Sequence, residues 1–281
     1  KRRFLFRETG FFRRGREEEM KKLSFVVMDL SGIYERESFW REREGALLLS
    51  LRDRFQRGGL RAPEEEALLR AELLRPELLG APLHFLDLSD YHYMSRFWLE
   101  QQEEDFLLVI YDYDADLRRT EQRGVSHASW TREIMLRMPH CRGILLIGPS
   151  AEKRARINDE LMSLGREYRP SPELRDPILS TSLYCFTDED LRNGRAESHI
   201  PSLLQLLSLP LCLSIDKRLF QGEGREGSGI GLEEYARSLS WILASALPIL
   251  SVDLCGEPEP EAPEELVLRE NERNRKFLDD W

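Results

Sequence analysis

The segment LLVIYDYDADL (residues 107–117) ends a run of apolar residues with aspartates at three alternate positions. Side chains two residues apart lie on the same side of an extended chain. Asp112, Asp114 and Asp116 would therefore point the same way just beyond a buried strand. Three carboxylates this close repel one another and raise one another's pKa unless a cation lies among them. The spacing thus indicates either a divalent-cation site or a phosphatase-type D-x-D pair around Mg²⁺.

Polar residues also stand at the ends of other apolar runs. They are His92 after the run at 83–88, then Ser214, Asp216 and Arg218 at alternate positions, and finally Asp253 with Glu257 shortly after it. In an open parallel sheet, ligands bind outside the carboxyl ends of the strands, so these side chains are expected to gather at one rim. One histidine with several aspartates suits Mn²⁺, Mg²⁺ or Zn²⁺. Taken singly, His92 could be a hydrogen-bonded loop residue, and Asp216 or Asp253 a helix cap.

The elements that must position these residues alternate along the chain. Seven short apolar runs are typical of strands in a parallel sheet that is covered on both faces: 23–30, 83–88, 106–112, 143–148, 182–186, 209–216 and 247–254. Helical patterns lie between or after them, at 61–74, 151–164 (which Gly165 would close), 232–246 and 265–278. We therefore predict an α/β fold, a three-layer αβα sandwich with a mostly parallel sheet of about seven or eight strands.

The chain is predicted to form a single α/β domain over residues 23–281, because no Pro/Gly-rich linker divides the series of strands. A basic segment, residues 1–22, precedes it. The acidic, Pro-rich stretch 257–265 is interpreted as a solvated connection to the last helix.

Composition excludes several classes of function. The net charge of −10 over 281 residues argues against general nucleic-acid binding, which requires a basic face. No segment approaches the roughly 20 apolar residues of a membrane span, and the basic N-terminal segment lacks the apolar core of a secretory signal. Cys141, Cys185, Cys212 and Cys255 lack C-x-x-C spacing and are predicted to be buried thiols, neither ligands nor disulfides. We expect a cytoplasmic protein with a small-molecule ligand and no nucleic-acid or membrane partner.

In its motifs the chain resembles the ureohydrolases (arginase, agmatinase, formiminoglutamase), which hydrolyse guanidino or formimino groups at a dinuclear manganese centre. DYHY resembles the first metal motif, with His92 as its histidine. YDYDAD resembles the D-x-H-x-D motif, and LCLSIDKRL resembles the S-x-D-x-D motif. The resemblance spans roughly residues 23–253. It implies an arginase-like fold, a metal-dependent hydrolase and assembly into a homo-oligomer.

Two positions depart from these motifs. Asp114 stands where the family has a histidine, and Arg218 stands where it has a second late aspartate. The ligands that the resemblance implies for the first metal are intact: His92, Asp112, Asp116 and Asp216. Arginine stays protonated and cannot ligate a metal. We therefore expect one Mn²⁺ rather than two, with Zn²⁺ or Fe²⁺ as alternatives. In this hypothesis Arg218 replaces the second ion and pairs with Asp112 and Asp114.

The resemblance also implies roles around the ion. His127 in VSHASW corresponds to a histidine that helps to bind substrate and relays protons, and Asp114 is the other residue predicted to take part in catalysis. Glu257, Asp253 and Arg218 are the predicted substrate-binding residues.

Three functions remain open at this stage. The first is a divergent hydrolase of a C–N bond in a guanidino- or formimino-type small molecule. The second is a binding or regulatory protein that has lost turnover because Arg218 blocks the site. The third is a D-x-D phosphatase with Asp112 as nucleophile and Asp114 as acid/base.

Overall fold

A single eight-stranded sheet forms the centre of the molecule. The computed structural model describes residues 24–119, 124–167, 181–220 and 231–280. The strands are β1 (Phe25–Asp29), β2 (Ala46–Ser50), β3 (Leu83–Phe85), β4 (Phe106–Tyr111), β5 (Cys141–Ile147), β6 (Ser182–Phe186), β7 (Leu211–Asp216) and β8 (Ile249–Cys255). Their order is β2-β1-β3-β8-β7-β4-β5-β6, and every pair is parallel. The predicted sheet is confirmed.

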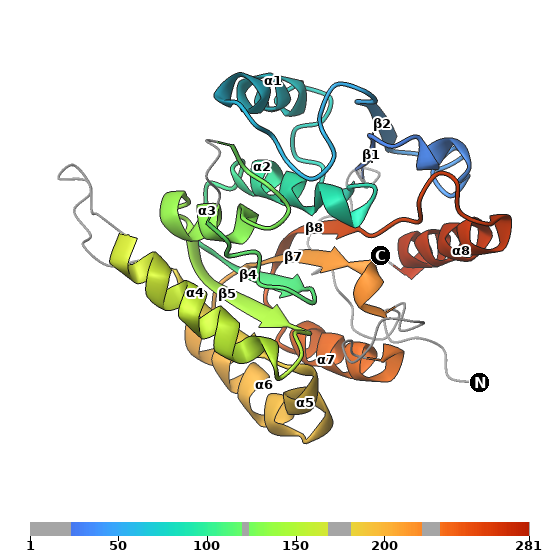
Figure 1. Cartoon of the computed structure of the whole chain (residues 1–281). Helices are drawn as coiled ribbons and strands as arrows, with labels where there is room; N and C mark the ends of the chain where they lie inside the picture. The colour runs from blue at the N-terminus through green and yellow to red at the C-terminus, as the bar shows by residue number, and fades with distance from the viewer. Residues whose placement is uncertain (1–23, 120–123, 168–180, 221–230, 281) are drawn as a thin grey trace, which may run out of the picture.

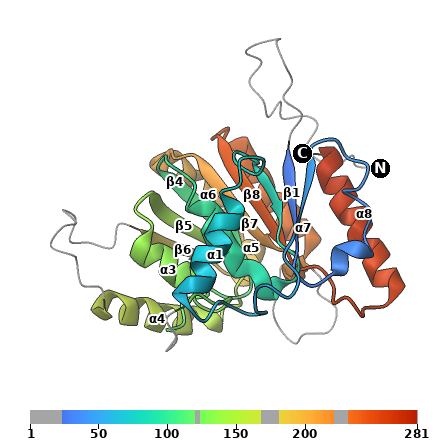
Figure 2. The same ribbon diagram turned by 90° about the horizontal axis from the view of Figure 1, so that it is seen from above.

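Helices cover both faces of the sheet and complete the predicted three layers (Figure 1). The first group packs on one core: α1 (Pro63–Leu73), α2 (Ser95–Leu99), α3 (Trp130–Arg137) and α4 (Lys153–Glu167). The second group packs on the other: α5 (Asp188–Arg192), α6 (Arg195–Leu207), α7 (Leu232–Ala244) and α8 (Glu264–Asp280). In Figure 2, α8 lies beside β1 near one edge of the sheet.

The period of the strands explains the two cores. In β1, Val26 and Met28 pack in the core beneath α1–α4, whereas Phe25 and Val27 pack in the core beneath α5–α8. A strand that is buried on both faces has no polar side, and for this reason the runs in the sequence are apolar without interruption.

The predicted elements agree with the structure except at identifiable places. The run ALLLS of β2, a half-exposed edge strand, was missed although it is as apolar as SLYCF of β6. Helices α2, α3, α5 and α6 were also missed, and α6 carries Pro201 in its interior. The predicted end of α4 at Gly165 is wrong, since the helix continues to Glu167.

Some predictions fall outside the described residues. The basic segment 1–22 is one of them. Within the described ranges, no helix is both long and apolar enough to cross a lipid bilayer.

Candidate metal centre

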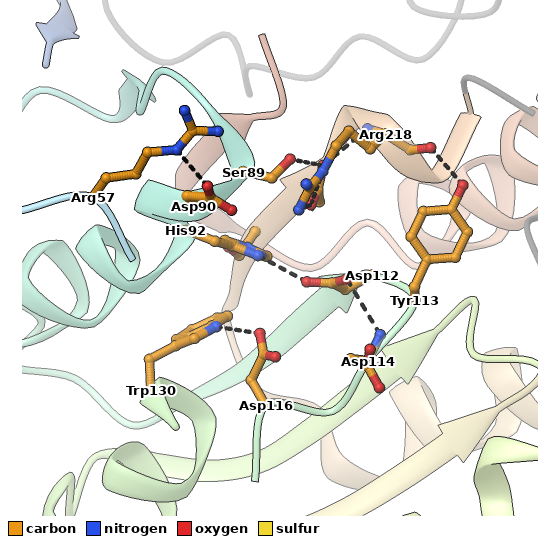
Figure 3. Close-up of polar contacts among 12 residues, drawn as sticks. Arg57, Ser89, Asp90, His92, Asp112, Tyr113, Asp114, Asp116, Trp130 and Arg218 are labelled. Atoms are coloured by element: carbon orange, nitrogen blue, oxygen red, sulfur yellow. Dashed lines mark hydrogen bonds and ion pairs between the residues drawn. The ribbon is translucent and has the colours of Figure 1, made fainter. Parts of the chain in front are cut away.

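A cavity of about 220 Å³ lies at the carboxyl ends of β4 and β7. Seven of the nine predicted site residues line it: His92, Asp112, Asp114, Asp116, His127, Asp216 and Arg218. Most of them appear in Figure 3, where side chains from the segments that follow β4 and β7 converge with those from the segment before α2. Ser89, Tyr113 and Lys153 complete the lining. The rule that ligands bind beyond parallel strands therefore placed most of the candidate residues in one space.

His92 lies at the floor of this cavity in a buried 3₁₀ helix, Ser89–Met94. Its Nδ1 is 2.8 Å from Asp112 Oδ2, and its Nε2 is 2.7 Å from Ser214 Oγ. Ser214 in turn lies 2.9 Å from Ser95 Oγ. The buried hydroxyls hold the imidazole ring in a fixed orientation toward the carboxylates, as partners of metal-binding histidines commonly do.

Two neighbouring groups set the charge of His92. Burial disfavours the charged imidazole, but Cys255 and Asp112 outweigh burial, and the pKa of His92 lies well above its usual value. Burial also raises the pKa of the Cys255 thiol to about 12. The thiol is therefore protonated at neutral pH, so Asp112 supplies the negative charge that favours the protonated form of His92.

Asp112 and Asp116 stand close together at the end of β4. Asp116 has a left-handed backbone with φ of 49°, and its Oδ2 accepts a hydrogen bond from Trp130 Nε1 at 2.7 Å. Burial, followed by repulsion from Asp112, raises the pKa of Asp116 well above its usual value. A dication between these two carboxylates would relieve this repulsion, which is what the spacing in the sequence predicted.

Arg218 does not pair with Asp112 and Asp114, and that part of the hypothesis is wrong. Its guanidinium Nη2 lies 3.1 Å from Asp216 Oδ2, and its backbone N–H donates to Asp216 Oδ1 at 2.9 Å. Ser89 Oγ also donates to Oδ1, at 2.6 Å. The two residues are only two positions apart, so the local turn after β7 brings them together. Burial would raise the pKa of Asp216, but the Arg218 charge holds it below its usual value.

Asp114 is engaged by cations of α4 instead. Lys153 Nζ lies 2.9 Å from Asp114 Oδ2, and Arg156 Nη2 lies 2.8 Å from Oδ1. Lys153 and Arg156 are three residues apart, and such residues are neighbours on a helix surface, so both can reach one carboxylate. This geometry gives no support to Asp114 as the acid/base of a phosphatase, because both of its oxygens are occupied.

The predicted metal ligands divide between two groups that share His92. The ligand atoms of His92, Asp112 and Asp116 lie within 4.8 Å of one another, and so do those of His92, Asp216 and Cys255. Sequence reasoning missed Cys255 because it interpreted every cysteine as an inert buried thiol. The signal that could have found it is its position at the end of the last predicted strand, as for the aspartates.

His127 lies at the exposed side of the cavity. Its Nδ1 is 2.9 Å from the carbonyl oxygen of Gly58, and its backbone N–H donates to the same oxygen at 3.1 Å. With Nδ1–H donating to a carbonyl, Nε2 is left as the basic nitrogen of the ring. This tautomer suits the predicted role in proton relay.

Asp253 does not reach the cavity. It is buried inside β8, where its Oδ1 lies 2.7 Å from His84 Nδ1 on the adjacent strand β3. The His84 ring stacks on Trp98 with their centroids 3.8 Å apart. Asp253 lies two residues before the end of its strand, which is about 7 Å below the rim at the rise of a β-strand. The structure therefore gives no support to its predicted contact with substrate.

Glu257 also lies away from the cavity. Its buried carboxylate pairs with Lys217 Nζ and accepts a hydrogen bond from Asn274 Nδ2 of α8 at 2.9 Å. Gly256, with φ of +95°, turns the chain between Cys255 and Glu257 toward α8. Of the three predicted substrate-binding residues, the cavity contains only Arg218.

Comparisons with known proteins agree with this arrangement at the level of the fold. No family model matches the chain. An uncharacterised protein of Thermotoga maritima is 24% identical over 246 residues, covering 83% of this chain and 80% of that protein.

Several solved structures share the architecture. Formimidoylglutamase from Bacillus subtilis superposes with a TM-score of 0.56 at 13% identity, covering 95% of this chain and 88% of that one. Arginase from Entamoeba histolytica gives 0.54 at 14% identity, covering 93% and 99%. Formiminoglutamase from Trypanosoma cruzi, whose structure was solved with Mn²⁺, gives 0.54 at 11% identity, covering 92% and 94%. The chain therefore has a ureohydrolase-like, arginase-like fold, and this degree of likeness extends to the fold alone.

Proposed function

We propose that this protein is a divergent metal-dependent hydrolase of a C–N bond in a guanidino- or formimino-type small molecule. The observation that carries the proposal is the cavity beyond β4 and β7, in which His92 stands within ligand distance of two pairs of potential metal-binding side chains. Solved structures with this fold include formiminoglutamases, arginases and a proclavaminate amidinohydrolase.

The residues of the cavity fit a divalent cation. Imidazole and carboxylate donors suit Mn²⁺, Zn²⁺ and Fe²⁺. Burial, followed by repulsion from Asp112, raises the pKa of Asp116 well above its usual value, and a bound dication would relieve this repulsion. A bound ion would polarise the substrate and lower the pKa of a water molecule, which supplies the nucleophile for hydrolysis. We favour one ion over two, because Asp114 and Arg218 replace two ligands implied by the family resemblance.

The chain's own residues would orient the reactants around this centre. Ser214 and Ser95 fix the ring of His92. His127, held through Nδ1 by Gly58, would accept a proton at Nε2 and deliver it to the leaving amine. The guanidinium of Arg218 lies at the wall of the cavity and would bind a polar or anionic group of the substrate.

A binding or regulatory role without turnover is the second candidate. Arg218 favours it, because its guanidinium and backbone N–H engage both oxygens of Asp216 and compete with a metal for that carboxylate. In this case the cavity would bind a small molecule that it does not cleave.

Metal content and turnover together separate the two candidates. Elemental analysis of the purified protein is expected to give about one Mn, Zn or Fe per chain, and this ion should be lost in Asp216→Ala. Release of formamide from formimino compounds and of urea from guanidino compounds should then depend on that metal. In Arg218→Asp, restoration of a carboxylate should add a second equivalent.

Metal binding without release from any of these compounds would favour the second candidate. Absence of metal from the wild-type protein, even after incubation with each ion, would overturn the hydrolase proposal. In this proposal the protein is a single domain over residues 23–281, lies in the cytoplasm and binds a small molecule. It also forms a homo-oligomer, which a measurement of its size in solution can test.

A further inference from the structure

Cys255 is the last residue of β8 and is fully buried. In the pairing of β7 with β8 it lies directly opposite Asp216. Neighbouring positions of two paired strands direct their side chains to the same face of the sheet. The thiol therefore lies buried beside the Asp216 carboxylate, which itself lines the cavity.

The turn after Cys255 holds it in this place. Gly256 adopts φ of +95°, and a Cβ at this position would lie 2.6 Å from Asp216 Oδ1 and 2.9 Å from Lys217 N. The backbone of β8 therefore presses against the end of β7 with no room for a side chain. This close approach brings the Cys255 sulfur within 4.8 Å of ligand atoms of both His92 and Asp216.

We propose that Cys255 is a metal ligand, and that His92, Asp216 and Cys255 form a nitrogen–oxygen–sulfur triad that selects Zn²⁺ or Fe²⁺ over Mn²⁺. This inference rests on the proposed function, because it assigns a ligand to the same centre. Three protein ligands that leave a fourth position for water are the usual arrangement of a catalytic zinc ion. Thiolate is a soft donor that suits Zn²⁺ and Fe²⁺, whereas Mn²⁺ prefers oxygen.

The charges balance when an ion binds to the triad. When the ion binds, the S–H bond of Cys255 would break and its proton would leave to solvent. His92 would likewise release the proton from the ring nitrogen that faces the ion, so that this nitrogen and the thiolate can both bond to the metal. Thiolate and carboxylate together carry two negative charges against the two positive charges of the ion. Asp216 already accepts hydrogen bonds from Ser89 and Arg218, and the Ser89 hydroxyl can rotate away to free a lone pair on Oδ1.

Cobalt substitution of the full-length protein provides the test. Co²⁺ bound by a thiolate absorbs in the near ultraviolet through sulfur-to-metal charge transfer, and Co²⁺ bound by oxygen and nitrogen alone does not. The wild-type protein loaded with Co²⁺ is expected to show this band. Cys255→Ser should lose it and should bind Zn²⁺ about 100-fold more weakly or worse, since even the loss of a supporting partner costs 10–100-fold.

Two further variants control the experiment. Cys212→Ser changes another buried cysteine, which belongs to neither ligand group, and should retain the band. Cys255→Asp replaces sulfur by oxygen and should shift the preference toward Mn²⁺ in competition dialysis. A wild-type protein that binds one Co²⁺ without the charge-transfer band overturns the role of Cys255 and leaves the hydrolase proposal standing. A wild-type protein that binds no metal at all overturns both.

Discussion

Two groups of buried polar residues lie at or just beyond the ends of β7 and β8, on different sides. Asp216 and Cys255 belong to the candidate metal centre, whereas Lys217 and Glu257, which lie one and two positions further along the chain, contact α8. We call the second group the α8 cluster; it consists of Glu37, Lys217, Glu257 and Asn274. The α8 cluster thus contains two carboxylates, of Glu37 and Glu257, and the metal centre contains those of Asp112, Asp116 and Asp216.

The two groups differ in the source of their positive charge. In the α8 cluster, Lys217 pairs with Glu257 and donates to Asn274 Oδ1 at 2.8 Å, and Asn274 donates to Glu37 at 3.0 Å. In the candidate metal centre, no Lys or Arg of the described residues forms an ion pair with Asp112 or Asp116. A buried charge requires a partner. The α8 cluster contains its own cation and is structural. In the metal centre Arg218 pairs with Asp216, which leaves Asp112 and Asp116 to receive an ion.

Removal of the internal cation should give the largest effect on stability. Lys217→Met leaves the Glu257 carboxylate buried without a charge partner, and such a loss typically destabilises a protein by about 3–5 kcal/mol. Urea unfolding followed by circular dichroism would measure it. Arg142→Met, which breaks a half-exposed pair with Asp105, is the control and should cost less than about 1 kcal/mol. Equal losses in the two variants would contradict the assignment of Lys217 as the cation on which the cluster depends.

The turn that separates the two groups should be the next most sensitive point. In Gly256→Ala, the new methyl group would meet Asp216 and the backbone of Lys217, in addition to the strain of a positive φ. We expect a loss of about 1–3 kcal/mol together with weaker metal binding. Gly80→Ala is a matched control, because Gly80 has φ of +80° and nothing within 4 Å of the added Cβ. If the two variants lose the same stability, the close approach at Gly256 is not a constraint.

Glu37 should make stability depend on pH. Burial, followed by repulsion from Glu257, raises the pKa of Glu37 to about 9 from the usual 4.5. The folded state therefore keeps a proton that the unfolded state releases above 4.5, and stability should fall as pH rises from about 5 toward 9. Glu37→Gln keeps an acceptor for Asn274 and cannot ionise. It should flatten this dependence by roughly 1–3 kcal/mol between about pH 5 and about pH 8.

Unfolding at several pH values would measure the Glu37 effect. Glu264→Gln is a control, because Glu264 is an exposed acid in a salt bridge with Arg36. This control should leave the slope unchanged. A wild-type protein whose stability rises with pH over this window would contradict the assignment.

The predictable part of the molecule is the part that hydrophobic periodicity and strand direction determine. Seven of the eight strands were visible as apolar runs, because a parallel sheet covered on both faces leaves no polar positions. His92, Asp112, Asp116 and Asp216 were placed at one rim because parallel strands end at the same edge. The half-exposed edge strand β2 also carries an apolar run, ALLLS, and was nevertheless missed.

The rest depends on local geometry that the sequence does not display. Asp253 and Cys255 share a strand and a face, yet only Cys255, two positions further along, comes within ligand distance of His92. Glu257 is diverted by the positive φ of Gly256. Arg218 pairs with Asp216 rather than with Asp112 and Asp114, because the turn after β7 folds it back on its own neighbour. The turn after a strand sets the direction of the side chains that follow. The rule that parallel strands end at one edge of the sheet therefore does not predict the contacts of those side chains.

The smallest effect is expected at Asp114, which stands inside the acidic triplet yet is balanced by its own cations. Its carboxylate is about one-third exposed and pairs with Lys153 and Arg156. Asp114→Ala should therefore cost about 1 kcal/mol or less in stability and leave the metal content unchanged. Asp112→Ala should weaken metal binding, because Asp112 contacts the ligand His92 and forms no ion pair with a Lys or Arg of the described residues. Elemental analysis of the two variants compares neighbours that the sequence makes equivalent. Loss of metal in Asp114→Ala would instead show that Asp114 is a ligand. Pairing with Lys153 and Arg156 would then not distinguish a structural carboxylate from one that binds the metal.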